Sequence, residues 1–493
     1  MNAITSAQTA TEGISTNQVF DTRFRSALAR MADNGRISVC RDAVDPHLEL
    51  AALLKKLDGR EALYFPDVKG YGTPVVGNLL NGRENCEAAF GTDYRGIREM
   101  IGRALGAPLP PQIVDRAPAQ EVVIRDVNLA RILPILYHAP DDAGRYITAG
   151  IVVVRDPETG VYNASYHRLQ LLGPDKLAIK LDYGRHLRAA FERAQAQRRP
   201  LPVAICIGVD LALYLTAATM GSQMPESADE LAVAGRLSGR PLTVAKAVSH
   251  DLLVPAEAEF ILEGEILPDE VAMEGPFGEF VGFAAPAANA PVLRVNAVTH
   301  RTKPIYHAIN GFGRETIGLR KYVLEASLLK VLQAAIPIVT DAEMTAGGLH
   351  RFHAVLQVKK TSPQHDGLQR NAMLAAFGAL KDLDLVTVVD EDIDIRDPLD
   401  VEYALATRME ASKDLVMVPA ARGHEYVRVS DRGMRTKLGI DATVPFEDKA
   451  RFQRIRFADV DRPADRFGGD LASLRSLVTS PAVTPPKKAD TSP

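Results

Sequence analysis

A short segment near the middle of the chain, residues 274–279 with the sequence EGPFGE, constrains the local fold more than any other stretch. Proline fixes φ near the value needed at the second position of a type I turn, and Gly278 then occupies the fourth position, where glycine is favoured. Glycine on both sides of the proline disfavours a helix. The segment therefore predicts a tight type I turn whose two flanking glutamates face a common space.

Two carboxylates held at the ends of one turn predict acid/base chemistry. Carboxylates this close do not ionise independently, so one of them is expected to have a raised pKa unless a cation lies between them. Such a pair supplies a proton donor and a carboxylate base at the same pH. The alternative is a surface turn with two solvated acids, and other segments have to decide between the two.

Length and composition set mild limits on the function. A chain of 493 residues is too long for one core and predicts two or three domains. The net charge of −4 and the lack of a basic stripe argue against a nucleic-acid-binding surface. The first residues lack a basic segment followed by an apolar one, and no apolar run approaches the length of a membrane span, so neither export nor membrane insertion is expected. Cys40, Cys86 and Cys206 are far apart and lack CxxC spacing, which fits a reducing cytoplasm.

The sequence pattern predicts three folded regions between two polar tails, residues 1–18 and 471–493. Residues 19–115 alternate helical and short apolar segments and predict an α/β domain. Residues 116–310 predict a β-rich domain interrupted by helices, and residues 311–470 predict a second α/β domain. The clearest helices are expected over residues 48–57 and 319–335, and the clearest strands over residues 62–65, 146–155, 201–208, 351–358 and 383–389.

Residues 163–168, with the sequence NASYHR, follow a turn and predict a strand that carries polar side chains on one face. Alternation places Asn163, Ser165 and His167 on one side. Ala164, Tyr166 and Arg168 lie on the other. A polar face with a nearby arginine is compatible with a phosphate or a metal-bridged phosphate, and a half-exposed strand explains the same residues.

Two further residues add possible metal ligands to Asn163. His186 and Glu230, with Asn163, offer imidazole, carboxylate and amide oxygen, a set that suits Mn²⁺ or Mg²⁺ bridging to an anionic cofactor. The alternatives are a surface histidine and a glutamate that helps to cap a helix. The acidic run at residues 390–394 is predicted to be a solvated loop. The Asp397-Pro398 pair predicts the capped start of a helix.

The order of these motifs resembles that of the UbiD family of reversible decarboxylases. Several other segments of this chain also read like that family, and the resemblance runs from about residue 20 to residue 460. These segments are residues 146–148 (YIT), 156–160 (DPETG), 258–264 (AEFILEG) and 437–443 (KLGIDAT).

The resemblance implies a mixed α/β (α+β) fold with a central, flavin-reductase-like split β-barrel that binds prenylated FMN. It implies that Asn163, His186 and Glu230 hold Mn²⁺ (or Mg²⁺), which together with K⁺ binds the cofactor phosphate. The positions that match cofactor-contacting positions of the family are Thr148, Asn163, Ala164, Ser165, Tyr166, His167, Arg168, Arg185, His186, Glu230 and Lys381.

The resemblance also implies a reaction and its partners. Arg168, Glu274 and Glu279 would form a Glu-Arg-Glu network in which Glu279 exchanges the proton and the flavin is the electron sink. The substrate would be an aromatic, heteroaromatic or α,β-unsaturated carboxylic acid that releases CO₂, with side chains around residues 310–315 setting its specificity. A flavin prenyltransferase would supply the cofactor, and the C-terminal domain would form a homodimer or a larger homo-oligomer.

Two other classes of function remain open from the residues alone. A paired-carboxylate hydrolase such as a glycosidase could use Glu274 and Glu279, although the chain has no tryptophan for a sugar platform. A non-catalytic flavin-binding or assembly protein would keep Asn163 and His186 but would not need Arg168 between two acids.

Overall fold

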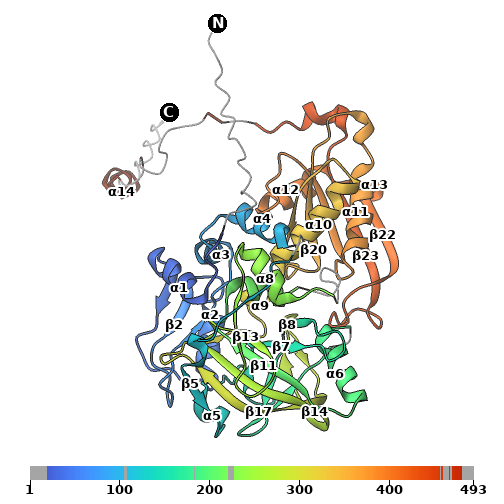
Figure 1. Ribbon diagram of the computed structural model, residues 1–493. Helices are drawn as coiled ribbons and strands as arrows, with labels where there is room; N and C mark the ends of the chain where they lie inside the picture. Colours follow the sequence, from blue (N-terminus) through green and yellow to red (C-terminus); the bar gives the residue numbers. More distant parts are fainter. Residues whose placement is uncertain are drawn as a thin grey trace, which may run out of the picture. The chain divides into compact units, whose positions relative to one another are not determined.

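The computed structural model describes residues 19–104, 108–182, 184–219, 227–455, 457–458, 466 and 469–479. The chain divides into one unit that ends at Phe446 and a second from Glu447 onward, which contains the helix α14 (Ala472–Thr479). The first unit has the predicted mixed α/β character, with helices and strands alternating along most of its length (Figure 1). In the described part of the chain, no helix has the length and apolar character needed to cross a membrane.

A curled nine-stranded sheet forms the centre of the first unit and confirms the predicted split barrel (Figure 1). Its strand order is β6-β9-β10-β17-β14-β11-β7-β8, and β5 pairs with β17. The bounds are β5 (Val122–Ile124), β6 (Tyr146–Ile147), β7 (Ile151–Arg155), β8 (Tyr162–Tyr166), β9 (Leu169–Leu171), β10 (Lys176–Ile179), β11 (Leu201–Ile207), β14 (Phe260–Glu274) and β17 (Ala288–His300).

The long strands β14 and β17 give this sheet its bend. Their antiparallel register shifts between Glu263 and Gly264 and again after Ile266, which is typical of β-bulges. Glycine is required at position 264, because a Cβ there would overlap the backbone carbonyl of Arg294 on β17. The bend carries the end of β14 toward the short sheet of β15 (Phe277–Gly278) and β16 (Ala284–Ala285).

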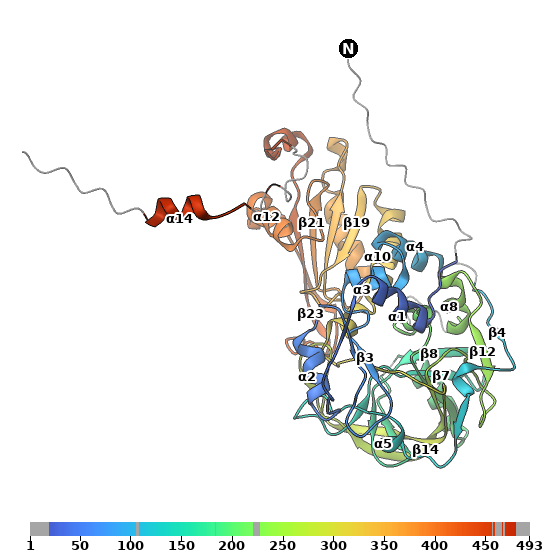
Figure 2. The same cartoon turned by 90° about the vertical axis from the view of Figure 1, so that its left-hand side faces the viewer.

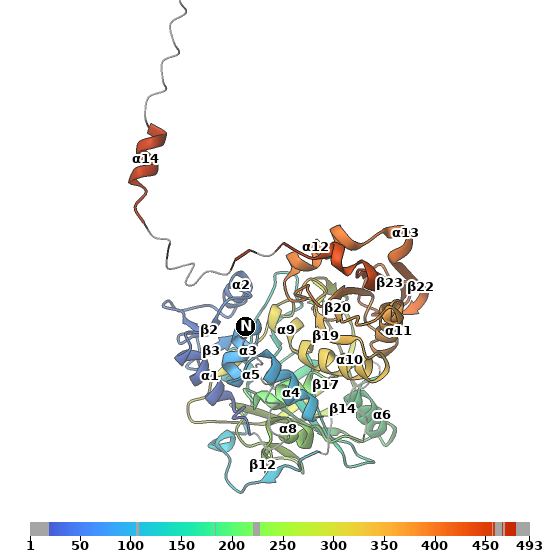
Figure 3. The same cartoon turned by 90° about the horizontal axis from the view of Figure 1, so that it is seen from above.

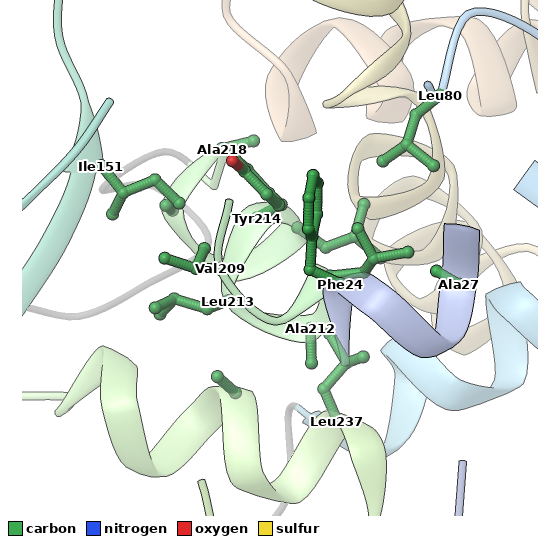
Figure 4. Close-up of a cluster of buried hydrophobic side chains, with 14 of the residues drawn as sticks. Phe24, Ala27, Leu80, Ile151, Val209, Ala212, Leu213, Tyr214, Ala218 and Leu237 are labelled. Atoms are coloured by element: carbon green, nitrogen blue, oxygen red, sulfur yellow. The ribbon is translucent and has the colours of Figure 1, made fainter. Parts of the chain in front are cut away.

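Both faces of the central sheet are buried, which explains why its strands are almost continuously apolar. Val152 and Ile205 belong to a core on one face, and Ile151 and Cys206 belong to a core on the other face. Figure 4 shows the second core, where Phe24, Tyr214 and Leu237 converge from separate helices. The helices around it are α1 (Phe24–Asp33), α3 (Arg83–Phe90), α4 (Tyr94–Ala104), α7 (Leu211–Ala217) and α8 (Glu230–Ser238), while α5 (Leu129–Ile132) and α6 (His186–Ala196) accompany the first face.

The strand predicted over residues 146–155 is two strands, β6 and β7, which pair with different neighbours. The chain leaves the ladder between them at Thr148, Ala149 and Gly150. A Cβ at position 150 would lie 2.7 Å from Cγ2 of Ile205, so glycine lets the backbone pass close to β11 at this break.

A four-stranded sheet of order β1-β2-β3-β18 lies beside the central sheet (Figure 2). Three of its strands come from the N-terminal region, and the fourth returns from beyond β17. This sheet and its neighbours comprise β1 (Ile37–Val39), α2 (Glu49–Lys56), β2 (Ala62–Phe65), β3 (Val75–Gly77) and β18 (Tyr306–Ala308). A smaller sheet joins β4 (Gln112–Ile113), β12 (Thr243–Lys246) and β13 (Leu253–Pro255), and the 3-10 turn η1 (Pro118–Gln120) precedes β5.

A five-stranded sheet in the C-terminal region, called the third sheet below, has the order β19-β20-β21-β23-β22 and is covered by helices on both faces (Figure 3). Helices α10 and α11 pack on one face, and α12 packs on the other. The elements are α9 (Arg314–Gly318), α10 (Lys321–Ala335), β19 (Val339–Met344), β20 (His353–Val358), η2 (Pro363–His365), α11 (Leu368–Ala379), β21 (Leu385–Asp390), α12 (Pro398–Arg408), α13 (Ala411–Asp414), β22 (Leu415–Arg422), β23 (Met434–Ala442) and η3 (Phe446–Phe452). The Asp397 carboxylate accepts from Leu399 N at 3.0 Å, which confirms the predicted cap.

A buried charged cluster joins α4 to α10 and β19. The Tyr94 hydroxyl donates to Glu325, and Glu343 Oε2 lies 3.3 Å from the same hydroxyl. Lys321 pairs with both carboxylates, and Arg396 Nε lies 3.6 Å from Glu343 Oε2. Burial, followed by the charge of Glu325, raises the pKa of Glu343, and Lys321 opposes that rise.

This cluster predicts a pH-dependent stability. Because the folded state holds a proton on Glu343 above its ordinary pKa of 4.5, the free energy of unfolding should fall as pH rises from 4.5 through the raised pKa. One such group contributes a slope of at most about 1.4 kcal/mol per pH unit. Denaturant unfolding of Glu343→Gln should show a shallower fall over that window, and Glu402→Gln, on the exposed side of α12, is the control. An unchanged slope in Glu343→Gln would contradict the prediction.

Candidate functional site

Arg168 lies between β8 and β9 and binds two glutamates, one at the end of β14 and one just after β15. Its Nε and Nη2 donate to the two carboxylate oxygens of Glu274, each at 2.8 Å, and its Nη1 donates to Glu279 Oε1. The Glu274 side chain is fully buried, whereas that of Glu279 keeps 17% of its surface exposed. The structure thus brings together the three residues predicted to form the acid/base network.

The turn between the two glutamates differs from the predicted one. Glu274 ends β14, Gly275 has φ of +86°, and the Gly275–Pro276 peptide is cis. Phe277 and Gly278 are already in the extended strand β15, so the prediction of a type I turn is wrong. The two carboxylates still converge, because both reach the same guanidinium.

Contacts from the central sheet hold this turn in place. Gly275 N donates to Gln170 Oε1 at 3.0 Å and to the Tyr146 hydroxyl at 3.2 Å. Gly278 N donates to Asp142 Oδ1 at 3.0 Å. The Phe277 ring packs 4.2 Å from the ring of Tyr146 and lies 5.5 Å from the Arg168 guanidinium carbon. Backbone and side chains together therefore fix where Glu274 and Glu279 point.

Burial gives Glu279 the character of a proton carrier. Desolvation raises its pKa above that of an ordinary glutamate, and the charge of Arg168 opposes this rise. Asp182 and Glu274 add smaller effects that raise it. Glu279 therefore holds its proton to a higher pH than a solvated glutamate does.

A cavity of about 800 Å³ opens beside this network. The predicted residues that line it are Thr148, Tyr166, His167, Arg168, Arg185, Glu279 and Lys381. The predicted residues outside its wall are Asn163, Ala164, Ser165, His186, Glu230 and Glu274. The described lining contains eight lysines and arginines against four aspartates and glutamates, so the cavity is suited to anions. Asn310 and Gly311 also line it, at the start of the segment predicted to set specificity.

Asn163, His186 and Glu230 meet beside the cavity, on β8 and at the starts of α6 and α8. Asn163 Nδ2 donates to Glu230 Oε1 at 2.8 Å, and His186 Nδ1 lies 3.4 Å from the same oxygen. Ser165 Oγ donates to Asn163 Oδ1 and lies 3.1 Å from His167 Nε2, so the predicted polar face of β8 is confirmed. The cap of α8 is Asp229, which leaves Glu230 free of that role.

This trio fits a divalent cation. Among the described residues, none donates a hydrogen bond to the buried Glu230 Oε2, and burial raises the pKa of this carboxyl. Within the described residues, no three His, Cys, Asp or Glu side chains gather closely enough to hold a metal. The cluster has two such side chains and completes its set with the amide of Asn163.

Several cavity residues were not predicted from the sequence, because they come from loops and a helix start of the C-terminal region that only tertiary packing brings to the cavity. Arg351 donates from Nε and Nη2 to Asp382 Oδ2 at 2.8 and 2.6 Å, and Tyr426 donates to Asp182 Oδ1 at 3.1 Å. Arg320 also lines the cavity. One signal was available: Arg320 is the N-cap of α10, and a cation is electrostatically unfavourable at a helix N-terminus.

The chain belongs to the UbiD family. The models described as the N-terminal, Rift-related and C-terminal domains of 3-octaprenyl-4-hydroxybenzoate carboxy-lyase match residues 28–105, 112–313 and 318–442. This result confirms the resemblance predicted from the motifs and identifies the protein as an enzyme of this carboxy-lyase family.

Similar proteins cover almost the whole chain. The UbiD-class enzyme HmfF from Pelotomaculum thermopropionicum, solved with FMN, is 41% identical with a TM-score of 0.86, over 90% of this chain and all of that one. An evolved dimeric form of HmfF, solved with prFMN, is 38% identical with a TM-score of 0.82 over the same shares. Anhydromevalonate phosphate decarboxylase from Methanothermobacter thermautotrophicus is 34% identical over 85% of this chain and 96% of its own.

Close packing behind the glutamate hairpin predicts a sensitive position. A Cβ at Gly311 would overlap the carbonyl oxygen of Gly278 and lie 2.9 Å from Cε1 of Phe277. Overpacking of this kind costs about 1–3 kcal/mol, so Gly311→Ala should lower the free energy of unfolding by that amount in denaturant titrations. Gly318→Ala, whose Cβ would meet its nearest neighbour at 3.5 Å, is the matched control. Equal stabilities of the two variants would refute this packing argument.

Proposed function

We propose that the protein is a reversible, non-oxidative decarboxylase of an aromatic, heteroaromatic or α,β-unsaturated carboxylic acid, with prenylated FMN as its cofactor. The observation that carries the proposal is the Arg168 guanidinium, held between Glu274 and Glu279 at the wall of a cation-rich cavity. Membership of a carboxy-lyase family and the prFMN bound to the evolved HmfF support it.

The cofactor would supply an electron sink. Loss of CO₂ leaves two electrons on an sp² carbon, and without such a sink this vinyl or aryl carbanion is too unstable to form. The residues proposed to bind it are Thr148, Asn163, Ala164, Ser165, Tyr166, His167, Arg168, Arg185, His186, Glu230 and Lys381. Ala164 is packed in the core of the sheet, so its contribution would come from its backbone.

Arg168 and Glu279 have distinct roles in the proposed reaction. Arg168 neutralises negative charge at the point where the substrate carboxylate enters. Glu279, protonated at its exposed carboxyl, gives that proton to the carbon that has lost CO₂, and it takes one back in the carboxylation direction. Glu274, which is fully buried, holds the guanidinium in its orientation through two hydrogen bonds.

Asn163, His186 and Glu230 are proposed to hold Mn²⁺ or Mg²⁺, which would bind the cofactor phosphate together with K⁺. Oxygen and imidazole ligands suit these ions, and the unpaired Glu230 Oε2 supports a cation at this point.

The burial of Glu274 argues against a paired-carboxylate hydrolase. Such an enzyme needs two carboxylates on opposite sides of the bond that it breaks. Here only Glu279 borders the cavity, and both oxygens of Glu274 accept hydrogen bonds from Arg168. A purely flavin-binding or assembly protein would not require this arrangement.

The proposed setting is the cytoplasm, where a flavin prenyltransferase would provide the cofactor. We also propose a homodimer or a larger homo-oligomer. The dimeric form of the evolved HmfF supports such an assembly.

Glu279→Gln tests the proton-donor role in enzyme loaded with prenylated FMN. Removing a positioned acid should lower the decarboxylation rate by ~10²–10⁴, and it should also abolish exchange of the product's C–H hydrogen with D₂O, followed by NMR. Flavin absorbance should stay at the wild-type level, because the substitution is isosteric. Wild-type rates of both reactions would refute the role of Glu279.

Glu274→Gln is the comparison for that experiment. It removes a carboxylate from the same guanidinium without altering the cavity wall. We expect a lower decarboxylation rate with measurable hydrogen exchange, since Glu279 still carries its proton. A complete loss of exchange would move the proton-transfer role to Glu274.

Glu230→Gln tests the metal site. Losing the carboxylate should reduce bound Mn²⁺, measured by elemental analysis of the purified protein, and should lower the flavin content after coexpression with a prenyltransferase. Loss of a metal ligand or its support typically lowers affinity by 10- to 100-fold. Glu192→Gln, at an exposed position of α6 outside the cavity wall, is the matched control. Unchanged metal and flavin contents in Glu230→Gln would contradict the assignment.

A further inference from the structure

Arg320 is a cation in the cavity wall that the proposed reaction does not use. It is the N-cap of α10 and lines the cavity with Thr316 and Ile317 of α9. Among the described residues, none accepts a hydrogen bond from its guanidinium, and none forms an ion pair with it.

The surroundings of Arg320 leave its charge uncompensated. Arg351 and Arg185 lie near enough to repel it, while Asp382 and Asp182 attract it. Asp382 is already bound by two nitrogens of Arg351, and Asp182 accepts from the hydroxyl of Tyr426. Burial and the two neighbouring arginines lower the pKa of Arg320 well below its usual value.

The dipole of helix α10 also disfavours the positive charge of Arg320. The N-terminus of α10 carries the positive end of the helix dipole, so a guanidinium there is opposed by the backbone as well. A buried charge without a partner is expensive, and a protein keeps one where a ligand supplies the opposite charge. An anion bound at Arg320 would remove the penalty from both the burial and the dipole.

The same electrostatic neighbours connect Arg320 to the reacting end of the cavity. The negative charge of Asp182 favours the charged form of Arg320, and it also raises the pKa of Glu279. Burial raises the pKa of Tyr426, whose hydroxyl is bonded to Asp182. The charge of Glu279 raises this pKa further, and the charge of Arg168 lowers it. Arg320, Arg168 and Glu279 line the same cavity, so an anion that pairs with Arg320 would lie in the compartment proposed for the substrate, while the trio proposed for the cofactor phosphate lies outside its wall.

We infer that Arg320 binds a second oxyanion carried by the substrate, so that the enzyme selects unsaturated or aromatic acids with a second carboxylate. One carboxylate would face Arg168 and Glu279 and leave as CO₂, and the other would form charge-assisted hydrogen bonds with the Arg320 guanidinium. This inference rests on the proposed decarboxylase function and names the substrate class for that site. The cofactor phosphate has the same oxyanion chemistry, and the experiment separates the two sources.

The test compares matched acids on the flavin-loaded enzyme by isothermal titration calorimetry. trans,trans-Muconate and sorbate differ by a carboxylate in place of a methyl group at the far end, and terephthalate and 4-methylbenzoate differ in the same way. Hydrogen bonds to charged groups account for roughly 10- to 100-fold in affinity. The diacid of at least one pair should therefore bind that much more tightly, and its advantage should shrink at high salt.

Variants assign that preference to one residue. Arg320→Gln should remove the preference for the diacid and leave the affinity for the monoacid and the flavin absorbance unchanged. Arg320→Lys should retain part of the preference, because it keeps the charge and loses the planar fork. The matched control is Arg422→Gln, which removes a cavity arginine already paired with Glu425, and its preference should equal that of the wild type.

Four outcomes would overturn the inference: no binding of any of the four acids, equal binding of both members of each pair by the wild type, an undiminished preference in Arg320→Gln, or loss of flavin from Arg320→Gln. The last would assign Arg320 to the cofactor phosphate. Failure of the proposed function has a different signature, which is the absence of CO₂ release and of hydrogen exchange with every acid. A monoacid decarboxylated without any diacid preference would refute the Arg320 assignment alone.

Discussion

The site depends on one desolvated guanidinium. Arg168 is nearly buried and meets two carboxylates that differ in exposure, since one is sealed in the protein and the other borders the cavity. A bidentate bond to the buried Glu274 fixes the plane of the guanidinium, and the remaining nitrogen then points to Glu279. The different burial of two chemically identical acids is the basis for proposing a structural role for Glu274 and a proton-transfer role for Glu279.

The curvature of the central sheet brings Arg168 and Glu274 together. Glu274 ends the bulged strand β14 in the middle of the strand order, while Arg168 lies in the connection between β8 and β9, which are near opposite ends of that order. Gln170 and Tyr146, from β9 and β6, bind the turn that follows Glu274. Hydrogen bonds from the central sheet thus hold the turn that lies between the two glutamates.

Local signals predicted much of the fold. The helix at residues 48–57, the strand at residues 62–65 and the cap at Asp397 are governed by periodicity and near neighbours, and the structure confirms them. The type I turn was wrong because hydrogen bonds from distant strands decide the backbone around Gly275.

The candidate site divides in a similar way. The convergence of Asn163, His186 and Glu230 followed from the family resemblance, because their spacing along the chain matches no short metal motif. Arg351 and Tyr426 could not be predicted, since they lie in loops that only tertiary packing brings to the cavity. The proposed domain limits and the role of each site residue stay predictions.

The return of the chain to the N-terminal sheet ties the first hundred residues to the cavity wall. β18 pairs with β3, and the chain passes directly from it into Asn310 and Gly311 of the cavity wall. Asn310 Nδ2 donates to the carbonyl of Ala51 at 3.0 Å, and Glu315 accepts from the amide of Leu79 at 2.9 Å. This part of the cavity wall is therefore held in place by the N-terminal region, and substitutions there can reshape the cavity without changing any residue that lines it.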